Sequence, residues 1–309
     1  MVLYPNKLPE SERVCSGICI GRNITSVLVQ QQAVECRFAS SDSWVILSPI
    51  EQSIKQKIDT IGTPLKDWNI NIYRGVLTGY NDAFIISTEK RNEILANCQT
   101  EDERTRTAEL IRPILRGRDI KRYSYDWANL WLINTHNGIK GKIPRIQIEN
   151  YPAIKAHLDQ YWEKISTRAD KGDTPYNLRN CAYMEDFSKP KIVWGNLNLT
   201  PNYALVENNS FINAPSSMIV PASKYLLAIL NSKIADFYIK LLGVTRNGGY
   251  FEYKPMFIEQ LPIPQLKIEN KELAQIERLI DNNNYTEIEY IVYNLYGLTQ
   301  DEINYINSL

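Results

Sequence analysis

The sequence predicts an α+β protein, in which short strands in a mixed or antiparallel arrangement pack with helices and precede a helical C-terminal module. Short runs of β-branched and aromatic residues, separated by turns rich in Asn and Pro, occupy the middle of the chain. Apolar residues at helical spacing occur before, between and after these runs. After about residue 265 the strand-like runs stop and helical patterns take over. These three observations give the fold class.

The first clear element is a helix that begins at Ser48. The sequence Ser48-Pro49-Ile50-Glu51 has the form of a capping box with proline at the first helical position, and isoleucines recur at helical spacing as far as Gly62. Alternating residues over 68–77 predict a half-buried strand, and residues 83–87 predict its partner strand. An α-helical segment therefore leads into a strand pair.

The later elements follow in order. The charged run from Glu89 to Arg106 predicts a solvated helix and loop, and an amphipathic helix is predicted over 151–169. A strongly apolar helix over 222–242 is predicted to lie in the core. Residues 270–309 predict two or three helices, the last opened by a capping box at Thr299. Short strands are predicted at 130–134, 190–195, 202–206 and 216–220, with a strand or two within 22–38.

The composition is that of a globular protein without a strong charge. Lys plus Arg is 35 and Asp plus Glu is 35, so the net charge is zero. Nucleic-acid binders are usually basic, so this balance counts against them unless the charges are segregated or a partner domain supplies more. Five cysteines form no disulfide framework, and no apolar segment approaches a membrane span or a signal peptide. We expect a reduced, cytoplasmic protein that does not enter a membrane.

Motifs for catalysis and for metal or cofactor binding are absent from the sequence. It contains no Gly-rich phosphate loop, no G-x-S-x-G elbow and only two histidines. An adenine-N6 methyltransferase needs a cofactor loop and an Asn/Asp-Pro-Pro-Tyr/Phe loop, and the chain has neither. Glu269-Asn270-Lys271 has the E-x-K form found in metal-dependent nucleases, a pattern common by chance. We therefore expect no catalytic, metal or cofactor-binding residues in this chain.

Several polar segments favour DNA binding. The densest basic run, residues 111–123, combines local positive charge with Gly117, which we expect to permit a tight turn between two arginines. Each segment also has a plain structural interpretation, as a solvated loop with ion pairs, a helix stop with a hairpin, or a turn. The candidate DNA-binding residues are Arg74, Thr78, Asn81, Arg112, Arg116, Arg118, Lys121, Arg122, Asn196, Asn198, Arg246, Asn247 and Lys254.

Taken together and in order, these segments resemble a known family. The relevant stretches are "WVILSPIEQSIKQKI", "GVLTGYNDAFIIS", "IRPILRGRDIKRY", "LWLINTHNG", "YPAIKAHLDQYWEKISTRADKGDTPYNLRNC", "FSKPKIVWG", "YLLAILNSKIADFYI", "GGYFEYKPMFIEQLPIP" and "IVYNLYGLTQDEI". They are similar to the TaqI-like C-terminal specificity domain of bacterial type II restriction enzymes and N6-adenine DNA methyltransferases. The resemblance extends over roughly residues 44–309.

The resemblance implies a division of labour. Residues 46–265 would be the target-recognition domain, 266–309 a helical C-terminal module, and 1–45 the remnant or lead-in of a preceding domain. The partners would be double-stranded DNA and a methyltransferase domain or subunit. S-adenosylmethionine, and Mg²⁺ for any nuclease, would belong to those other domains. The alternatives are a specificity-like subunit that mainly docks a methyltransferase, through the 222–242 helix or the helical tail, and an enzyme in its own right.

Overall fold

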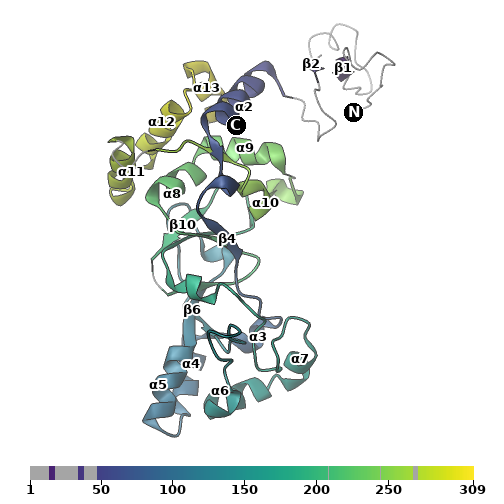
Figure 1. Ribbon diagram of the computed structural model, residues 1–309, viewed down its shortest axis with the longest axis vertical. Coiled ribbons are helices and arrows are strands. Elements are labelled where there is room, and N and C mark those ends of the chain that lie inside the picture. The colour runs from purple at the N-terminus through teal and green to yellow at the C-terminus, as the bar shows by residue number, and fades with distance from the viewer. Residues whose placement is uncertain (1–13, 18–33, 38–46, 208, 244, 267–270) are drawn as a thin grey trace.

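The computed structural model describes residues 14–17, 34–37, 47–207, 209–243, 245–266 and 271–309 (Figure 1). Within the first 45 residues, strands β1 (Val14–Gly17) and β2 (Val34–Arg37) pair antiparallel. The strand predicted within 22–38 is present as β2, and the remainder of that prediction lies outside the described residues. The arrangement of helices and small sheets confirms the α+β class.

A four-stranded antiparallel sheet lies at the centre of the molecule. Its order is β10 (Tyr203–Val206), β8 (Lys191–Trp194), β12 (Ser217–Val220) and β4 (Asn71–Arg74). Successive side chains of a strand point to opposite faces, and here the two faces belong to two hydrophobic cores. Ile192 and Ile219 join the first core, whereas Val193 and Met218 join the second. The sheet is therefore the wall that both cores share.

The first core is formed mostly by helices. It holds side chains from both early and late segments, and Figure 1 shows α2 beside the C-terminal helices. Ser48 caps α2, Thr299 caps α13, and both capping boxes are present, as predicted. The helices are α2 (Pro49–Ile61), α8 (Lys224–Leu230), α9 (Lys233–Leu242), α10 (Pro255–Ile258), α11 (Lys271–Asp281), α12 (Tyr285–Leu295) and α13 (Gln300–Ser308).

The predicted single helix over 222–242 is two helices. Asn231 ends α8, and Ser232 begins α9 by accepting a hydrogen bond from the Ala235 amide at 3.2 Å. The Asn231 amide nitrogen donates to the carbonyls of Tyr203 and Leu227, which compete with helical bonding at this point. Both helices are buried, which confirms the prediction that this segment lies in the core.

The second core lies below a mixed sheet. This sheet has the order β11 (Phe211–Ile212), β6 (Ile111–Leu115), β7 (Leu130–Ile133) and β5 (Ile85–Ser87), with β11 parallel to β6. The prediction that 83–87 pairs with 68–77 is wrong. The short helix α3 (Asn81–Phe84) redirects the chain, so that β5 pairs with β7 while β4 pairs with β12.

Four helices pack around the second core (Figure 1). They are α4 (Thr88–Ala96), α5 (Glu101–Leu110), α6 (Pro152–Asp159) and α7 (Trp162–Thr167). The run 89–106 thus forms parts of two helices, and the predicted helix 151–169 breaks at Gln160-Tyr161. A continuous helix over 151–169 would place Trp162 on one apolar face with Ile154, Leu158 and Ile165, but with the break Trp162 is 45% exposed whereas the other three are buried.

Two small strand pairs complete the fold. β3 (Thr63–Pro64) pairs with β14 (Pro262–Ile263), and β9 (Leu197–Asn198) pairs with β13 (Phe251–Glu252). Among the described residues, no helix is both long and apolar enough to cross a bilayer. The β9–β13 pair borders the cleft described next.

Candidate nucleic-acid interface

A cleft of about 600 Å³ forms where loops from distant parts of the sequence meet. It brings together six of the predicted residues, which come from three separate segments. No Asp or Glu occurs among the described residues that line it. The predicted residues in the lining are Asn81, Arg116, Arg118, Lys121, Asn196 and Asn198, and the lining that was not predicted includes Leu197, Leu199, Asn202, Asn213, Ser216 and Tyr250.

Two glycines form the contact between the loops. A Cβ atom on Gly195 would lie 3.2 Å from the Gly117 Cα and carbonyl oxygen, which is tighter than ordinary packing. The chain makes a tight turn at Gly117–Asp119, as expected, but Gly117 is not among the residues with positive φ, so the turn itself does not require a glycine. The function of Gly117 is close approach of two backbones, because neither loop has room for a side chain there.

Arg116 is held inside the loop by Asp119. Its Nε and Nη2 donate to the two Asp119 carboxylate oxygens at 3.0 and 2.8 Å, and the Arg116 amide donates to the same carboxylate. Asp119 is only 5% exposed, and its hydrogen bond raises the pKa of Arg116. This bidentate pair fixes the shape of the loop and neutralises much of the arginine's charge.

Arg118 and Lys121 present the free charge of the cleft. Both are exposed, and within the described part of the chain neither belongs to an ion pair. The Lys121 ammonium donates to the Arg118 backbone carbonyl at 2.9 Å, and both residues line the cleft. Phosphate binding needs cations of this kind, available to a ligand without breaking an internal ion pair.

Arg122 and Arg112 lie elsewhere. The Arg122 guanidinium donates to the Asn231 carbonyl at 3.2 and 3.0 Å and pairs with Glu289 at 2.5 Å, so it fastens the loop to the helices. It borders a neighbouring pocket of about 410 Å³ that shares Leu199 with the cleft. Arg112 lies opposite Leu132 in the mixed sheet, four residues before Arg116, and does not line the cleft.

The amides of the cleft differ in their freedom. The Asn81 side-chain oxygen accepts a 2.6 Å hydrogen bond from the Thr78 hydroxyl. Thr78 is only 2% exposed, so it does not line the cleft itself but holds the Asn81 side chain in position. Asn198 donates to the Gly195 carbonyl at 2.7 Å, and the Asn196 side-chain oxygen is buried without a partner in the described residues. Sequence reasoning missed Asn202 and Asn213. Their only sequence signal is that polar residues adjoin short strands, at the start of β10 and the end of β11.

The remaining candidates flank the cleft. Arg246 and Lys254 both pair with Glu252, at 2.8 and 2.5 Å, and these hydrogen bonds lower the pKa of that carboxyl. Asn247 is exposed on the adjoining turn, where Gly248 and Gly249 have φ of 76° and 81°. None of the three polar residues lines the cleft.

Arg74 is exposed at the end of β4 and does not line the cleft either. Its carbonyl accepts a hydrogen bond from the Tyr183 hydroxyl at 3.1 Å. The next residue, Gly75, donates to the carbonyl of Ser216, a lining residue, at 2.7 Å. Arg74 therefore lies beside the cleft wall.

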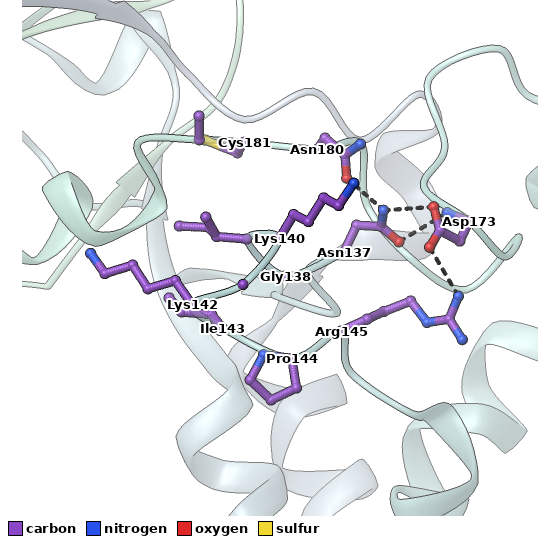
Figure 2. A pocket seen from close by; sticks show the side chains of 13 residues that line it. Asn137, Gly138, Lys140, Lys142, Ile143, Pro144, Arg145, Asp173, Asn180 and Cys181 are labelled. Carbon is purple, nitrogen blue, oxygen red and sulfur yellow. Dashed lines mark hydrogen bonds and ion pairs between the residues drawn. The ribbon is translucent and has the colours of Figure 1, made fainter.

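A second concavity, of about 860 Å³, lies beside a hairpin over 138–143, and Figure 2 shows its lining. Arg145 pairs with Asp173 at 3.1 Å, and Lys142 pairs with Glu185. Asn137 donates to Asp173 and to Asn180 (Figure 2). Sequence reasoning did not select this pocket, and two of its three cations are paired internally.

The described residues contain no group of three His, Cys, Asp or Glu side chains arranged to hold a metal ion. Glu269 of the E-x-K pattern lies outside the described residues. The cleft instead combines cations, amides and apolar side chains, which can bind a polyanion with polar edges.

Comparison with known proteins agrees with the resemblance drawn from the sequence. Residues 112–263 match the family of TaqI-like C-terminal specificity domains. This region is a TaqI-like specificity domain. Within the specificity domain lie all the cleft residues named above except Asn81.

The relatives are longer than this chain. The type II methyltransferase M.XhoI of Xanthomonas vasicola is 19% identical over 272 residues, which is 85% of this chain and 46% of the relative. The Type IIL restriction-modification enzyme MmeI, solved in complex with DNA, has 12% identity and a TM-score of 0.56 over 79% of this chain and 36% of its own. The type IIG restriction endonuclease BpuSI has 13% identity and a TM-score of 0.53 over 84% and 32%. This chain thus spans less than half of the length of each of these proteins.

Proposed function

We propose that this chain is the DNA target-recognition part of a restriction-modification enzyme and that its acid-free cleft binds the duplex. The observation that carries the proposal is the lining of the cleft, where Arg118 and Lys121 are unpaired and no carboxylate opposes them. The zero net charge of the whole chain is compatible with this, because positive charge is concentrated where acids are absent.

In this proposal, the cations and the amides have separate tasks. Arg118 and Lys121 contact phosphates and set the register of the protein on the duplex, without reading sequence. Asn202 and Asn213, whose amides bond to none of the described residues, face the bases, and an asparagine amide can bond adenine N6 and N7 with two hydrogen bonds. Arg246 and Asn247 extend the same surface beyond Tyr250.

The proposal assigns the chemistry to another domain or subunit. A methyltransferase would hold S-adenosylmethionine and the flipped adenine, and this chain would bind no cofactor itself. The place of action would be the cytoplasm, where the duplex is found. The docking alternative is not favoured, because residues 226–230, on the helix proposed for docking, are at most 1% exposed.

Selection from a randomised duplex library tests this function. The purified full chain should enrich one sequence motif, and Arg118→Ala should lower recovery of all sequences without changing the motif. Arg104→Ala is the matched control, since Arg104 is an exposed arginine of α5 outside the cleft and outside the ion pairs of the described residues. Absence of any enrichment, by the chain alone and by its complex with a co-expressed methyltransferase, would refute the proposal.

A further inference from the structure

Two leucines stand exposed inside this cationic cleft. Leu197 is 50% exposed and Leu199 is 51% exposed, although the neighbouring lining is composed of cations and asparagines. Tyr250, which is 42% exposed, lies in the same lining. Large apolar side chains gathered at a concave polar site mark a binding surface.

The leucines are held on a rigid support. The strand β9, which contains Leu197, pairs with β13, whose Phe251 is 2% exposed. The Tyr253 amide donates to the Asn196 carbonyl at 2.9 Å, and the Trp194 indole donates to the Tyr253 carbonyl at 2.7 Å. This two-stranded ribbon is anchored in the first core on one side, so its leucines keep their positions at the cleft.

Leu199 lies just after β9, beside the turn that contains Gly248 and Gly249. A Cβ on Gly249 would lie 3.8 Å from a methyl carbon of Leu199, so the Leu199 side chain has the side-chain-free backbone of Gly249 as its neighbour. Leu197 lies on β9 and Leu199 in the bend that follows it, and both leucines are exposed and line the cleft. A ligand that enters the cleft therefore meets two adjacent aliphatic side chains.

We infer that Leu197 and Leu199 read thymine, by packing against the C5-methyl groups that line the major groove at A·T pairs. The inference rests on the proposed function and specifies one base-pair type that the cleft recognises. An apolar protein surface would be a poor occupant, because it would cover Arg118 and Lys121 without pairing their charges. Duplex DNA supplies both phosphates for these cations and methyl groups for the leucines.

Two further considerations favour methyl contact over insertion between bases. Apolar wedges are typically inserted between bases from the minor groove, whereas a two-stranded ribbon fits the major groove, which is about 12 Å wide. The cleft also holds five asparagines, and asparagine is the side chain suited to adenine. An Asn–adenine contact and a Leu–thymine contact would read the two halves of one base pair.

Replacement of thymine by deoxyuridine tests the inference one methyl group at a time. The motif selected by the wild-type chain is resynthesised with deoxyuridine at each thymine in turn, and the affinity of each duplex is measured. Loss of a contacted methyl should weaken wild-type binding by about fourfold, the equivalent of one buried methyl group. In Leu197→Ala or Leu199→Ala the same substitution should have no effect, because the side chain that packs on the methyl is gone.

The control is Ile61→Ala, which truncates an aliphatic side chain that is 43% exposed on α2 and outside the cleft, and it should keep the full deoxyuridine penalty. Unchanged thermal unfolding of both leucine variants verifies that they fold.

Three results would overturn the inference and leave the proposed function standing. They are a selected motif without A·T pairs, deoxyuridine duplexes that bind as well as thymine duplexes, and a deoxyuridine penalty that persists in both leucine variants. A Leu199-dependent rise in 2-aminopurine fluorescence would indicate insertion and overturn it as well. Failure of the wild-type chain to select any sequence would refute the proposed function itself.

Discussion

Two polar concavities in the described part of the protein differ in how their cations are paired. The hairpin pocket of Figure 2 is the larger, at about 860 Å³ against about 600 Å³ for the cleft. Arg145 and Lys142 of the hairpin pocket are bound to Asp173 and Glu185, whereas Arg118 of the cleft meets no acid in the described part of the chain. Each pocket contains asparagines, but those of the hairpin pocket bond to one another and to Asp173.

A basic residue that is paired with an acid must break that pair before it can bind a polyanion, so the proposed function favours the cleft over the hairpin pocket. The run 111–123 shows the same distinction within one segment. Arg116 pairs with Asp119 and Arg122 with Glu289, which leaves Arg118 and Lys121 as the cleft cations without an ion pair among the described residues. Neither a count of basic residues nor the volume of a concavity makes this distinction.

The largest expected effect comes from removing the available pair. Arg118→Ala with Lys121→Ala should lower the log–log salt slope of duplex binding by about two, since each lost phosphate contact removes about 0.9. At 0.1 M salt relative to 1 M this corresponds to roughly 60-fold weaker binding, about eightfold for each contact. Fluorescence anisotropy over a salt series measures both quantities.

The matched double variant is Lys142→Ala with Arg145→Ala in the hairpin pocket. It removes the same formal charge but should leave the salt slope unchanged, because those cations are already paired with acids. An equal loss of slope in the two double variants would erase the distinction between the pockets.

Asp119→Asn tests whether the net charge of the cleft or the shape of its basic loop has the larger effect on DNA binding. The substitution adds one positive charge to the cleft, so charge counting alone predicts tighter DNA binding. The carboxylate, however, accepts three hydrogen bonds from Arg116, and their loss at a buried site should destabilise the protein by about 1–3 kcal/mol and weaken binding. Denaturant unfolding together with anisotropy separates these outcomes.

Asp173→Asn is the corresponding change in the hairpin pocket. Its ion pair with Arg145 is more exposed and worth about 0–1 kcal/mol, so both stability and affinity should stay close to wild type. Tighter binding by Asp119→Asn would show that field strength outweighs loop shape.

Two asparagine variants, one in each concavity, test which of the two surfaces reads the DNA sequence. Asn202→Ala should reduce discrimination at one position of the selected motif by about 1–3 kcal/mol, as expected for a lost base contact, because Asn202 lines the cleft and its side chain bonds to none of the described residues. Asn137→Ala should leave discrimination intact, because Asn137 bonds to Asp173 and Asn180 within the protein. Competition binding against single-base variants of the motif gives both values, and relaxed discrimination in Asn137→Ala alone would move the reading surface to the hairpin pocket.

The smallest expected effect is that of pH. The described lining of the cleft contains no His, Asp, Glu or Cys, so affinity at constant ionic strength should be flat between about pH 6 and pH 8. Burial lowers the pKa of His136, which precedes the hairpin pocket, and keeps the ring neutral near pH 7. Protonation on acidification would add positive charge there, so affinity that rises as pH falls, and that His136→Gln abolishes, would place DNA beside the hairpin.

Local features of the sequence predicted local structure well. Capping boxes at Ser48 and Thr299 identified the starts of α2 and α13, and the apolar run 222–242 was correctly placed in the core. The break at Asn231 was missed, because its amide is satisfied by the Tyr203 carbonyl, a partner 28 positions away. Strand pairing failed for the same reason, since β4 pairs with a strand that begins only at Ser217.

The cleft shows the same limit. Arg118, Lys121 and Asn198, which the sequence selects as DNA-binding candidates, line the cleft, and their contact with DNA stays a prediction. Arg122 was grouped with them, yet its partner Glu289 lies 167 positions later, and no local pattern indicates that pairing. No pattern in the sequence singled out Leu197 and Leu199, because their exposure depends on what the tertiary fold leaves uncovered.

The shared central sheet has a consequence for transplanting this specificity into another enzyme. One face of the sheet belongs to a core in which α8 contacts the sheet and the three C-terminal helices pack on α8 and α9, with α2 in the same core, so the support of the cleft loops comes from segments far apart in the sequence. A cassette limited to residues 112–263 would carry the cleft loops, α8 and α9 without the edge strand β4, α2 and the C-terminal helices that complete this core. A graft that preserves the cleft must therefore carry Pro49–Ile61 and Lys271–Asp281 through Gln300–Ser308 along with the loops.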